Sequence, residues 1–233
     1  MEHVPVLATE LIDLIAVRPG DIVVDGTFGA GGHARLITAQ MAGSGTYIGV
    51  DRDPGAAARF AAFAAEQSGI TTRFVAATFP DAFAALHAES VSANVVILDI
   101  GVSSMQIDEP QRGFSYMADG PLDMRMDPST GTGADMLVNE GSADEIARVL
   151  REYGEEPSAW RIAQAIVVAR DLEPITTTRQ LANIIYEASP AAARAGRGHP
   201  AKRSFQALRI AVNDELGMID RGLDAALELL APG

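Results

Sequence analysis

Short apolar runs alternate with amphipathic segments through the first hundred residues of the chain. Four runs have the length and composition of buried strands, at residues 22–25, 47–51, 72–76 and 94–100. Segments in which apolar positions recur with helical spacing precede and separate these runs, at residues 6–16, 33–41, 54–67 and 79–88. Strands that alternate with helices predict an α/β fold with a doubly wound parallel sheet.

The pattern changes after residue 100. A stretch rich in Gly, Pro, Asp and Met extends to about residue 133, and helical patterns then follow at residues 142–153, 158–170, 176–189 and 202–230. An all-helical block inside an alternating pattern predicts an inserted domain. We therefore expect the first part of an α/β domain at 1–108, an inserted loop and helical domain at 109–200, and a return to the α/β domain at 201–233.

The composition is that of a globular protein, because 48% of the 233 residues are hydrophobic and 21% are charged. No apolar run has the length of a membrane span, and the N-terminus lacks the basic start of a signal peptide. These features predict a cytoplasmic protein that does not bind a membrane. The chain has no cysteine and only four scattered histidines, so we expect neither disulfides nor a metal site.

Residues 25–33, with the sequence DGTFGAGGH, lie between the first expected strand and the helix that follows it. Glycines allow a ligand to approach the backbone, and the helix directs its first N–H groups toward the same place. Asp51 ends the second apolar run, where a carboxylate in such folds binds ribose hydroxyls. The stretch predicts a nucleotide site, although an ordinary glycine-rich loop has the same composition.

Asp25 bears on which nucleotide is bound. Residues 29–34 also satisfy the pattern of a dinucleotide site, but a carboxylate four residues before the glycines would repel a pyrophosphate. An acid at this place is typical of S-adenosylmethionine sites. Asp99 ends the fourth apolar run, at the edge of the sheet where ligands bind, and is a second candidate unless it only caps the next helix.

The long loop after residue 100 carries spaced carboxylates at Asp119, Asp123 and Asp127. These invite a metal, but the nearby Arg112 and Arg125 are the more plausible partners. The same loop holds two aromatic residues, at positions 114 and 116, which either stack on a base or pack in the core.

The formal net charge of −13 argues against binding of nucleic acid through the overall field of the protein. Positive charge is nevertheless concentrated in one short region. Its members are Arg194, Arg197, His199, Lys202, Arg203 and Arg209. A solvated surface is the simpler interpretation of this cluster from charge alone.

Eight motifs together resemble a known family. They are HVPVL at 3–7, DGTFGAGGH at 25–33, DRDP at 51–54, DIGVSS at 99–104, RGFS at 112–115, DGPLDMRMD at 119–127, YGEE at 153–156 and HPAKRSFQALRI at 199–210. The chain is similar over essentially its whole length to the RsmH (MraW) family of bacterial 16S rRNA cytosine-N4 methyltransferases. The last three motifs are far more specific than the glycine loop.

The resemblance implies a class I S-adenosylmethionine-dependent methyltransferase fold whose inserted helical domain recognises the substrate. The implied activity is methylation of the N4 amine of a cytidine in the decoding region of 16S rRNA, with small-subunit rRNA or the 30S subunit as partner. Family members continue past the equivalent of Gly233 with a strand and further sheet. We therefore expect a fold that is incomplete at the C-terminus and a chain that lacks activity without that segment.

Residue roles follow from the same resemblance. The implied cofactor residues are Gly31, Gly32 and His33 beside the methionine portion, Asp51 at the ribose, Phe79 and Asp99 by the adenosine, and Gln106 completing the pocket. Asp99, or a nearby loop carbonyl, is the candidate catalytic acceptor for the amine hydrogens. Lys202, Arg203 and Arg209 are expected to hold RNA phosphates.

Three other hypotheses are compatible with the residues. One is a small-molecule methyltransferase, which the acidic charge favours, and another is a nicotinamide-dependent dehydrogenase. The third is a non-catalytic module that binds cofactor or RNA. The sequence leaves a homodimer open.

Overall fold

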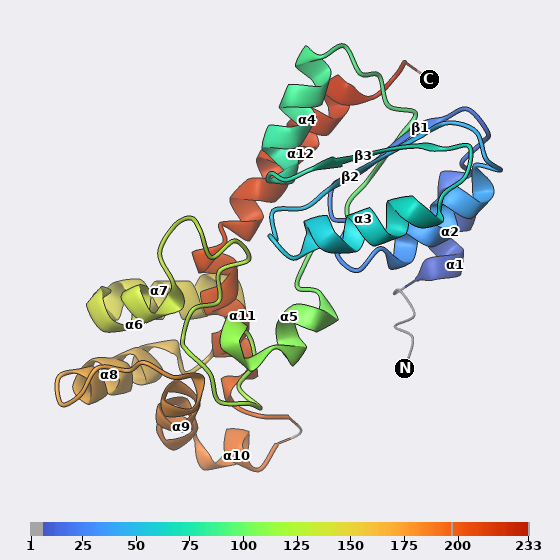
Figure 1. Ribbon diagram of the computed structural model, residues 1–233. Helices are drawn as coiled ribbons and strands as arrows, with labels where there is room; N and C mark the ends of the chain where they lie inside the picture. Colours follow the sequence, from blue (N-terminus) through green and yellow to red (C-terminus); the bar gives the residue numbers. More distant parts are fainter. Residues whose placement is uncertain (1–6, 197, 233) are drawn as a thin grey trace. The chain divides into compact units, whose positions relative to one another are not determined.

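The computed structural model describes residues 7–196 and 198–232 (Figure 1). The chain forms two compact units. Residues Met1–Gly101 and Leu216–Gly233 make up an α/β unit, and Val102–Glu215 make up a helical unit. The boundaries expected from the sequence, at residues 108 and 200, both fall inside the helical unit. Helix α11 (Ala201–Val212) belongs to that unit because its Phe205 and Leu208 are part of the helical core.

The α/β unit is built on a four-stranded parallel sheet with the strand order β3-β2-β1-β4, which confirms the predicted fold class. The strands are β1 (Ile22–Asp25), β2 (Thr46–Val50), β3 (Thr71–Val75) and β4 (Val95–Ile97). Asp25 is in register with Gly49 of β2 and with Ile97 of β4. The carboxyl ends of these three strands therefore meet at one edge of the sheet. Strand β4 is shorter than the expected run at 94–100.

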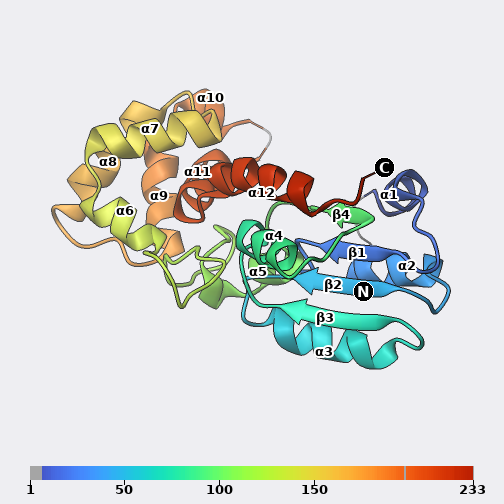
Figure 2. The same cartoon turned by 90° about the horizontal axis from the view of Figure 1, so that it is seen from above.

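Helices cover both faces of this sheet (Figure 1). One face packs against α1 (Ala8–Ile15), α2 (Gly32–Gln40) and α3 (Ala56–Glu66), with Tyr47 and Phe63 among the buried side chains. The other packs against α4 (Phe79–Ala88) and α12 (Glu215–Leu229), with Phe83 and Leu229 in its cluster. Figure 2 shows the strands side by side between these helices. Apolar side chains on both faces of β1 and β2 are thereby buried, as expected of a parallel sheet.

The prediction of a single helix at residues 202–230 is wrong, because the structure has two helices there. Helix α11 ends at Val212, and α12 begins at Glu215. Between them Asp214 has a φ of 48°, a left-handed conformation that interrupts helical hydrogen bonding. After α12 the chain runs parallel to the segment before β4, where Ala93 donates to the Leu229 carbonyl at 2.9 Å and accepts from the N–H of Ala231 at 2.8 Å.

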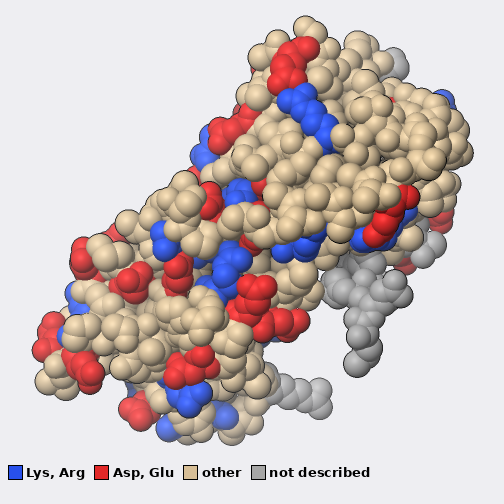
Figure 3. Space-filling view, viewed as in Figure 1, with Lys and Arg blue, Asp and Glu red and all other residues tan. Residues whose placement is uncertain are grey.

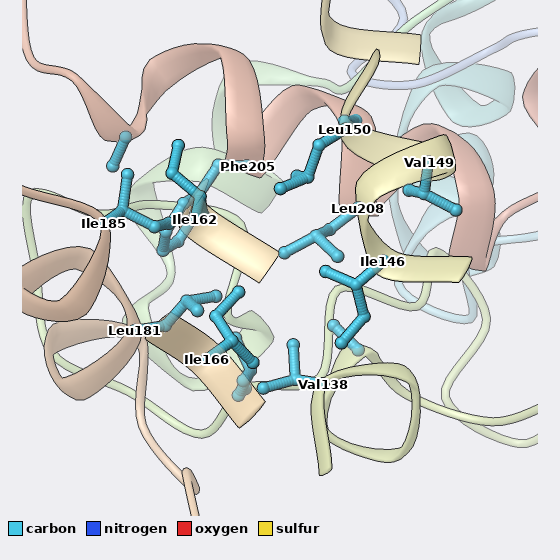
Figure 4. Close-up of a cluster of buried hydrophobic side chains, with 14 of the residues drawn as sticks. Val138, Ile146, Val149, Leu150, Ile162, Ile166, Leu181, Ile185, Phe205 and Leu208 are labelled. Atoms are coloured by element: carbon cyan, nitrogen blue, oxygen red, sulfur yellow. The ribbon is translucent and has the colours of Figure 1, made fainter. Parts of the chain in front are cut away.

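The helical unit packs several short helices around one apolar core (Figure 4). Its elements are α5 (Ser104–Asp108), a 3-10 turn (Pro110–Arg112), α6 (Ala134–Glu140), α7 (Ala143–Gly154), α8 (Ala159–Arg170), α9 (Thr178–Ala188), α10 (Ala191–Arg194) and α11. Ser142 caps α7, and Thr177 with Gln180 forms a capping box on α9. These caps confirm the starts predicted for both helices.

The surface of the described residues carries both signs of charge. On the face shown in Figure 3, Lys and Arg side chains are interspersed with Asp and Glu. None of the helices in the described ranges combines the length and the apolar character that a membrane span requires.

Candidate cofactor site

The loop after β1 has a shape that two glycines make possible. Gly29 has a φ of 56° and Gly31, which precedes α2, has a φ of 76°, both in the left-handed region. A Cβ on Gly31 would lie 2.9 Å from the Phe28 ring, so the loop also needs glycine there for space. A Cβ on Gly29 would meet only the Thr27 carbonyl oxygen, at 3.7 Å. The backbone at Gly29 is therefore open to close approach by a ligand.

Asp51, just after β2, holds this loop in place. Its Oδ2 accepts a hydrogen bond from the N–H of Gly29 at 2.8 Å, and its Oδ1 accepts from the N–H of Asp53 at the same distance. Burial raises the pKa of Asp51, and the two N–H donors oppose that rise. Because each carboxylate oxygen has a second lone pair, the group can accept further hydrogen bonds from ligand hydroxyls.

Asp25 lies beneath the loop and is buried. Its carboxylate accepts hydrogen bonds from the hydroxyl of Tyr47 at 2.5 Å and from the N–H of Thr27 at 3.0 Å. Burial raises the pKa of Asp25, although both hydrogen bonds lower it, and burial places the pKa of Tyr47 well above its ordinary value. The tyrosine therefore stays protonated and donates. Asp25 positions the loop from below.

Asp99 is the exposed carboxylate at this edge of the sheet. Its side chain is 59% exposed, and its Oδ2 lies 3.5 Å from Nδ1 of His33 on α2. Its backbone N–H donates to the Thr27 hydroxyl at 2.7 Å. The loop is thus bounded by Asp51 on the β2 side and by Asp99 on the β4 side.

Three supporting residues were not predicted from the sequence. Thr27 links the loop to the end of β4, and Tyr47 supplies a donor to Asp25. Arg59 on α3 donates from Nε to the Gly29 carbonyl at 2.9 Å. The register pairs Val23 with Tyr47, so strand alignment would have placed Tyr47 on the face of Asp25. Nothing in the sequence marks Arg59.

Phe79 and Gln106 have contacts elsewhere. Phe79 packs near Phe83, with ring centroids 6.0 Å apart, and its ring fills the space that a side chain on Gly222 would need. Gln106 lies on α5 of the helical unit, is buried and accepts a hydrogen bond from the N–H of Ser103 at 3.1 Å. The roles expected for both in the cofactor site stay predictions.

The three phosphate-binding candidates differ in availability. Lys202 and Arg203 are exposed on α11, and Arg203 donates to the Glu155 carbonyl at 3.0 Å. Arg209 instead forms a bidentate ion pair with the buried Glu215, at 2.7 and 3.0 Å, and is itself only 20% exposed. Arg209 is therefore the least available of the three for RNA.

The carboxylates of the long loop are paired within it or with a neighbouring helix. Arg125 donates to both oxygens of Asp123 at 2.8 Å, which confirms the arginine as its partner and lowers the pKa of that carboxyl. Asp119 lies 3.6 Å from Arg179 of α9. Among the described residues no cluster of His, Cys, Asp and Glu has the geometry of a metal site. Phe114 is part of the buried core.

A glycine loop lies between carboxylates at the carboxyl ends of parallel strands, which is where open α/β sheets bind their ligands. The model of the MraW methylase family matches residues 1–233. A ribosomal RNA small subunit methyltransferase H of Heliobacterium modesticaldum is 48% identical over 99% of this chain and 74% of its own length. Proteins of the same name from Symbiobacterium thermophilum and Acidothermus cellulolyticus are 50% and 48% identical, over 99% of this chain and 73% and 71% of their own lengths. The chain belongs to the MraW methylase family.

Proposed function

We propose that this protein is an S-adenosylmethionine-dependent methyltransferase that modifies the N4 amine of a cytidine in the decoding region of 16S rRNA. Membership of a methylase family and the names of the relatives support the reaction and the RNA class. The main structural support for the site is the glycine loop. Asp51 accepts a hydrogen bond from Gly29 of this loop, and the N–H of Asp99 donates to the hydroxyl of Thr27. Such an enzyme would work in the cytoplasm, where ribosomal subunits are assembled.

The residues present fit S-adenosylmethionine. That cofactor carries positive charge on its sulfonium and its ammonium, and two hydroxyls on its ribose. Asp51 offers acceptors for the hydroxyls, and the open backbone at Gly29 permits close approach. Gly31, Gly32 and His33 would line the methionine portion. Asp99 and the buried Asp25 supply negative charge for a cationic ligand. When bound, the cofactor supplies an electrophilic methyl group.

The reaction needs orientation and a hydrogen-bond acceptor. The lone pair of the cytosine amine is delocalised into the ring, so the nitrogen is a poor nucleophile until it rehybridises. An acceptor close to the amine hydrogens favours that change, because the hydrogens become more acidic as the nitrogen attacks. Asp99 suits this role since its carboxylate is exposed. His33 and Thr27 position it through the side chain and the backbone respectively.

The target base must leave its stack to reach a site at the edge of a sheet. Irregular or single-stranded RNA lowers the cost of this step. Lys202 and Arg203 are exposed on α11 and are the side chains we assign to phosphates of the substrate. A net charge of −13 makes such local contacts necessary, since the overall field repels RNA.

The test uses two carboxylates with different expected roles. Asp51→Ala should weaken S-adenosylmethionine binding by about 10-fold or more, because the ribose loses a charged acceptor. Asp99→Asn should weaken that affinity less than Asp51→Ala does, because solvent screens the exposed carboxylate, and should lower the rate of methylation by about 100-fold. Calorimetry on this chain measures the first effect, and mass spectrometry of N4-methylcytidine in small-subunit RNA measures the second, with each variant made in a chain extended to the length of its relatives.

Asp13→Asn is the matched control, because Asp13 is an exposed carboxylate on α1. It should change neither quantity. An Asp99→Asn variant that methylates at the wild-type rate would remove Asp99 from catalysis. Protection of small-subunit RNA in footprinting separates an RNA methyltransferase from one that acts on a small molecule.

A further inference from the structure

Three aromatic rings from separate segments form a stack in the helical unit. Tyr116 lies in the loop between the 3-10 turn and α6, Tyr186 lies on α9, and His199 precedes α11. The rings of Tyr116 and His199 are 5.0 Å apart between centroids, with planes inclined by 18°. The Tyr186 ring is 6.0 Å from His199, inclined by 30°. We call these three residues the aromatic stack.

The inner end of the stack is held by the core. Phe205 is buried, and its ring meets Tyr116 edge to face at 5.6 Å and 79°. Nδ1 of His199 accepts a hydrogen bond from the N–H of Ala201 at 3.1 Å, which fixes the orientation of the imidazole. A ring that is already held in one orientation loses little conformational entropy when a ligand stacks on it.

The outer end of the stack is exposed and carries positive charge. Tyr186 is 42% exposed, and the Arg194 guanidinium lies 5.6 Å from the centroid of its ring. Arg194 is itself exposed, as is Lys202 on α11. Core packing explains Phe205, but it does not explain a tyrosine that extends the stack into solvent beside an arginine.

We propose that the aromatic stack and Arg194 form a platform on which unpaired bases of single-stranded RNA stack. Every base has a face that suits an aromatic ring, and a guanidinium either stacks on a base or pairs with its phosphate. The platform holds unpaired nucleotides of the substrate RNA. This inference rests on the proposed function, and it identifies the form of RNA bound as single-stranded and unpaired.

The affinity test uses a fluorescent, unstructured RNA of about ten nucleotides. Tyr186→Ala should weaken binding by about 5- to 150-fold, which corresponds to about 1–3 kcal/mol of lost stacking. Tyr186→Phe, which keeps the ring, should bind like wild type. Arg194→Ala should also reduce the slope of log affinity against log salt concentration by about 0.7, whereas Tyr186→Ala should not change it.

Trp160→Ala is the matched control, because Trp160 is an aromatic residue of similar exposure, 45%, on α8 of the same unit. It should bind RNA like wild type. Equal loss of affinity in Trp160→Ala and Tyr186→Ala, or no loss in either, would overturn the platform.

Cross-linking of wild-type protein to RNA containing 4-thiouridine adds a measurement that needs no variant. The platform predicts cross-links on peptides with Tyr116 or Tyr186, and cross-links confined to other peptides would refute it.

Methylation of small-subunit RNA by the wild-type sequence and by Tyr186→Ala, each extended to the length of the relatives, separates this inference from the proposed function. If the wild type methylates and Tyr186→Ala binds and methylates equally well, only the platform fails. If the wild type neither binds the RNA nor methylates, both fail. A lower methylation rate in Tyr186→Ala, with unchanged affinity for S-adenosylmethionine, supports both.

Discussion

The carboxylates beside the glycine loop and two carboxylates of the helical unit are stabilised by different partners. In the α/β unit Asp25 and Asp51 accept hydrogen bonds from backbone N–H groups and, for Asp25, from a tyrosine hydroxyl. Burial raises the pKa of both. In the helical unit Asp123 and Glu215 instead accept bidentate hydrogen bonds from arginines, and Arg125 lowers the pKa of Asp123.

The difference indicates which acids serve structure and which remain able to bind a ligand. An arginine neutralises a carboxylate, so Asp123 and Glu215 keep a loop and a helix end in place. Neutral donors leave the charge largely intact, so the acids beside the glycine loop still attract a cation. The comparison predicts that stability in the helical unit depends on arginines, and that stability around the loop depends on pH.

The largest effect is expected from Arg209→Ala. Removal of the guanidinium leaves the buried carboxylate of Glu215 without its bidentate partner, which should cost about 3–5 kcal/mol of unfolding free energy. Denaturant unfolding followed by fluorescence measures it, because the one tryptophan of the chain, Trp160, lies in the helical unit.

Arg203→Ala is the control for this prediction, since Arg203 is exposed on the same helix. Arg203→Ala should change the free energy of unfolding by less than about 0.5 kcal/mol. It should still weaken RNA binding, because the side chain is assigned to a phosphate. Equal stability of the two variants would show that the Arg209–Glu215 pair does not stabilise the unit.

A smaller effect is expected from Asn213→Ala, also in the helical unit. The buried amide accepts from the N–H of Met126 at 2.8 Å and donates to the carbonyls of Met124 and Arg209 at 2.7 and 2.9 Å. Loss of these bonds should cost about 2–3 kcal/mol. The tryptophan transition should shift to lower denaturant.

Asn139→Ala provides the comparison, because Asn139 makes similar bonds to Ile175 from a half-buried site. Water can replace part of what it loses, so its cost should be lower. An Asn139→Ala variant less stable than Asn213→Ala would contradict the expectation that the loss of hydrogen bonds costs more at a buried site.

The smallest effect, and the one that depends on pH, is expected from Tyr47→Phe in the α/β unit. The variant removes the donor to Asp25 and should cost about 1–2 kcal/mol at neutral pH. The folded pKa of Asp25 is already raised, and loss of the hydroxyl raises it further. The cost should therefore be small below the unfolded pKa and should grow as pH rises through the folded pKa.

Unfolding measured as a function of pH, from below the ordinary pKa of an aspartate up to neutral pH, tests this prediction. Far-ultraviolet circular dichroism reports the secondary structure of both units and should show the change, whereas the Trp160 signal, which reports the helical unit, should move less. A cost that does not vary with pH would mean that Asp25 does not titrate over the measured range. Equal shifts of both signals in all three variants would show that the units unfold together.

Local sequence patterns predicted most of the helices and strands, because the formation of each element depends largely on residues close together in the sequence. The apolar runs gave β1 and β2 almost residue by residue, and Ser142 and Thr177 marked true helix starts. The break between α11 and α12 was missed, because Asp214 is polar and continues the amphipathic pattern while its backbone is left-handed. Backbone conformation at a single residue is not encoded in periodicity.

The site was predictable where a residue stands at the end of an element. Asp51 and Asp99 each follow an apolar run, so their place at the carboxyl edge came from topology alone. The partners of these acids were not predictable in the same way. Arg59 donates to Gly29 from thirty positions away in the sequence, and Arg209 is paired with Glu215, which no motif in the sequence marks. Such contacts depend on packing between elements.

The α/β unit is assembled from two segments of the chain, and the residues of the helical unit lie between these segments in the sequence. Pairing of Ala93 with Leu230, and packing of Phe79 against Gly222, join segments that are far apart in sequence. Closing a flexible loop of about 100 residues costs about 4 kcal/mol of chain entropy. Folding of the helical unit first would shorten that loop, so the rate at which α12 docks should depend on how early the inserted helices form.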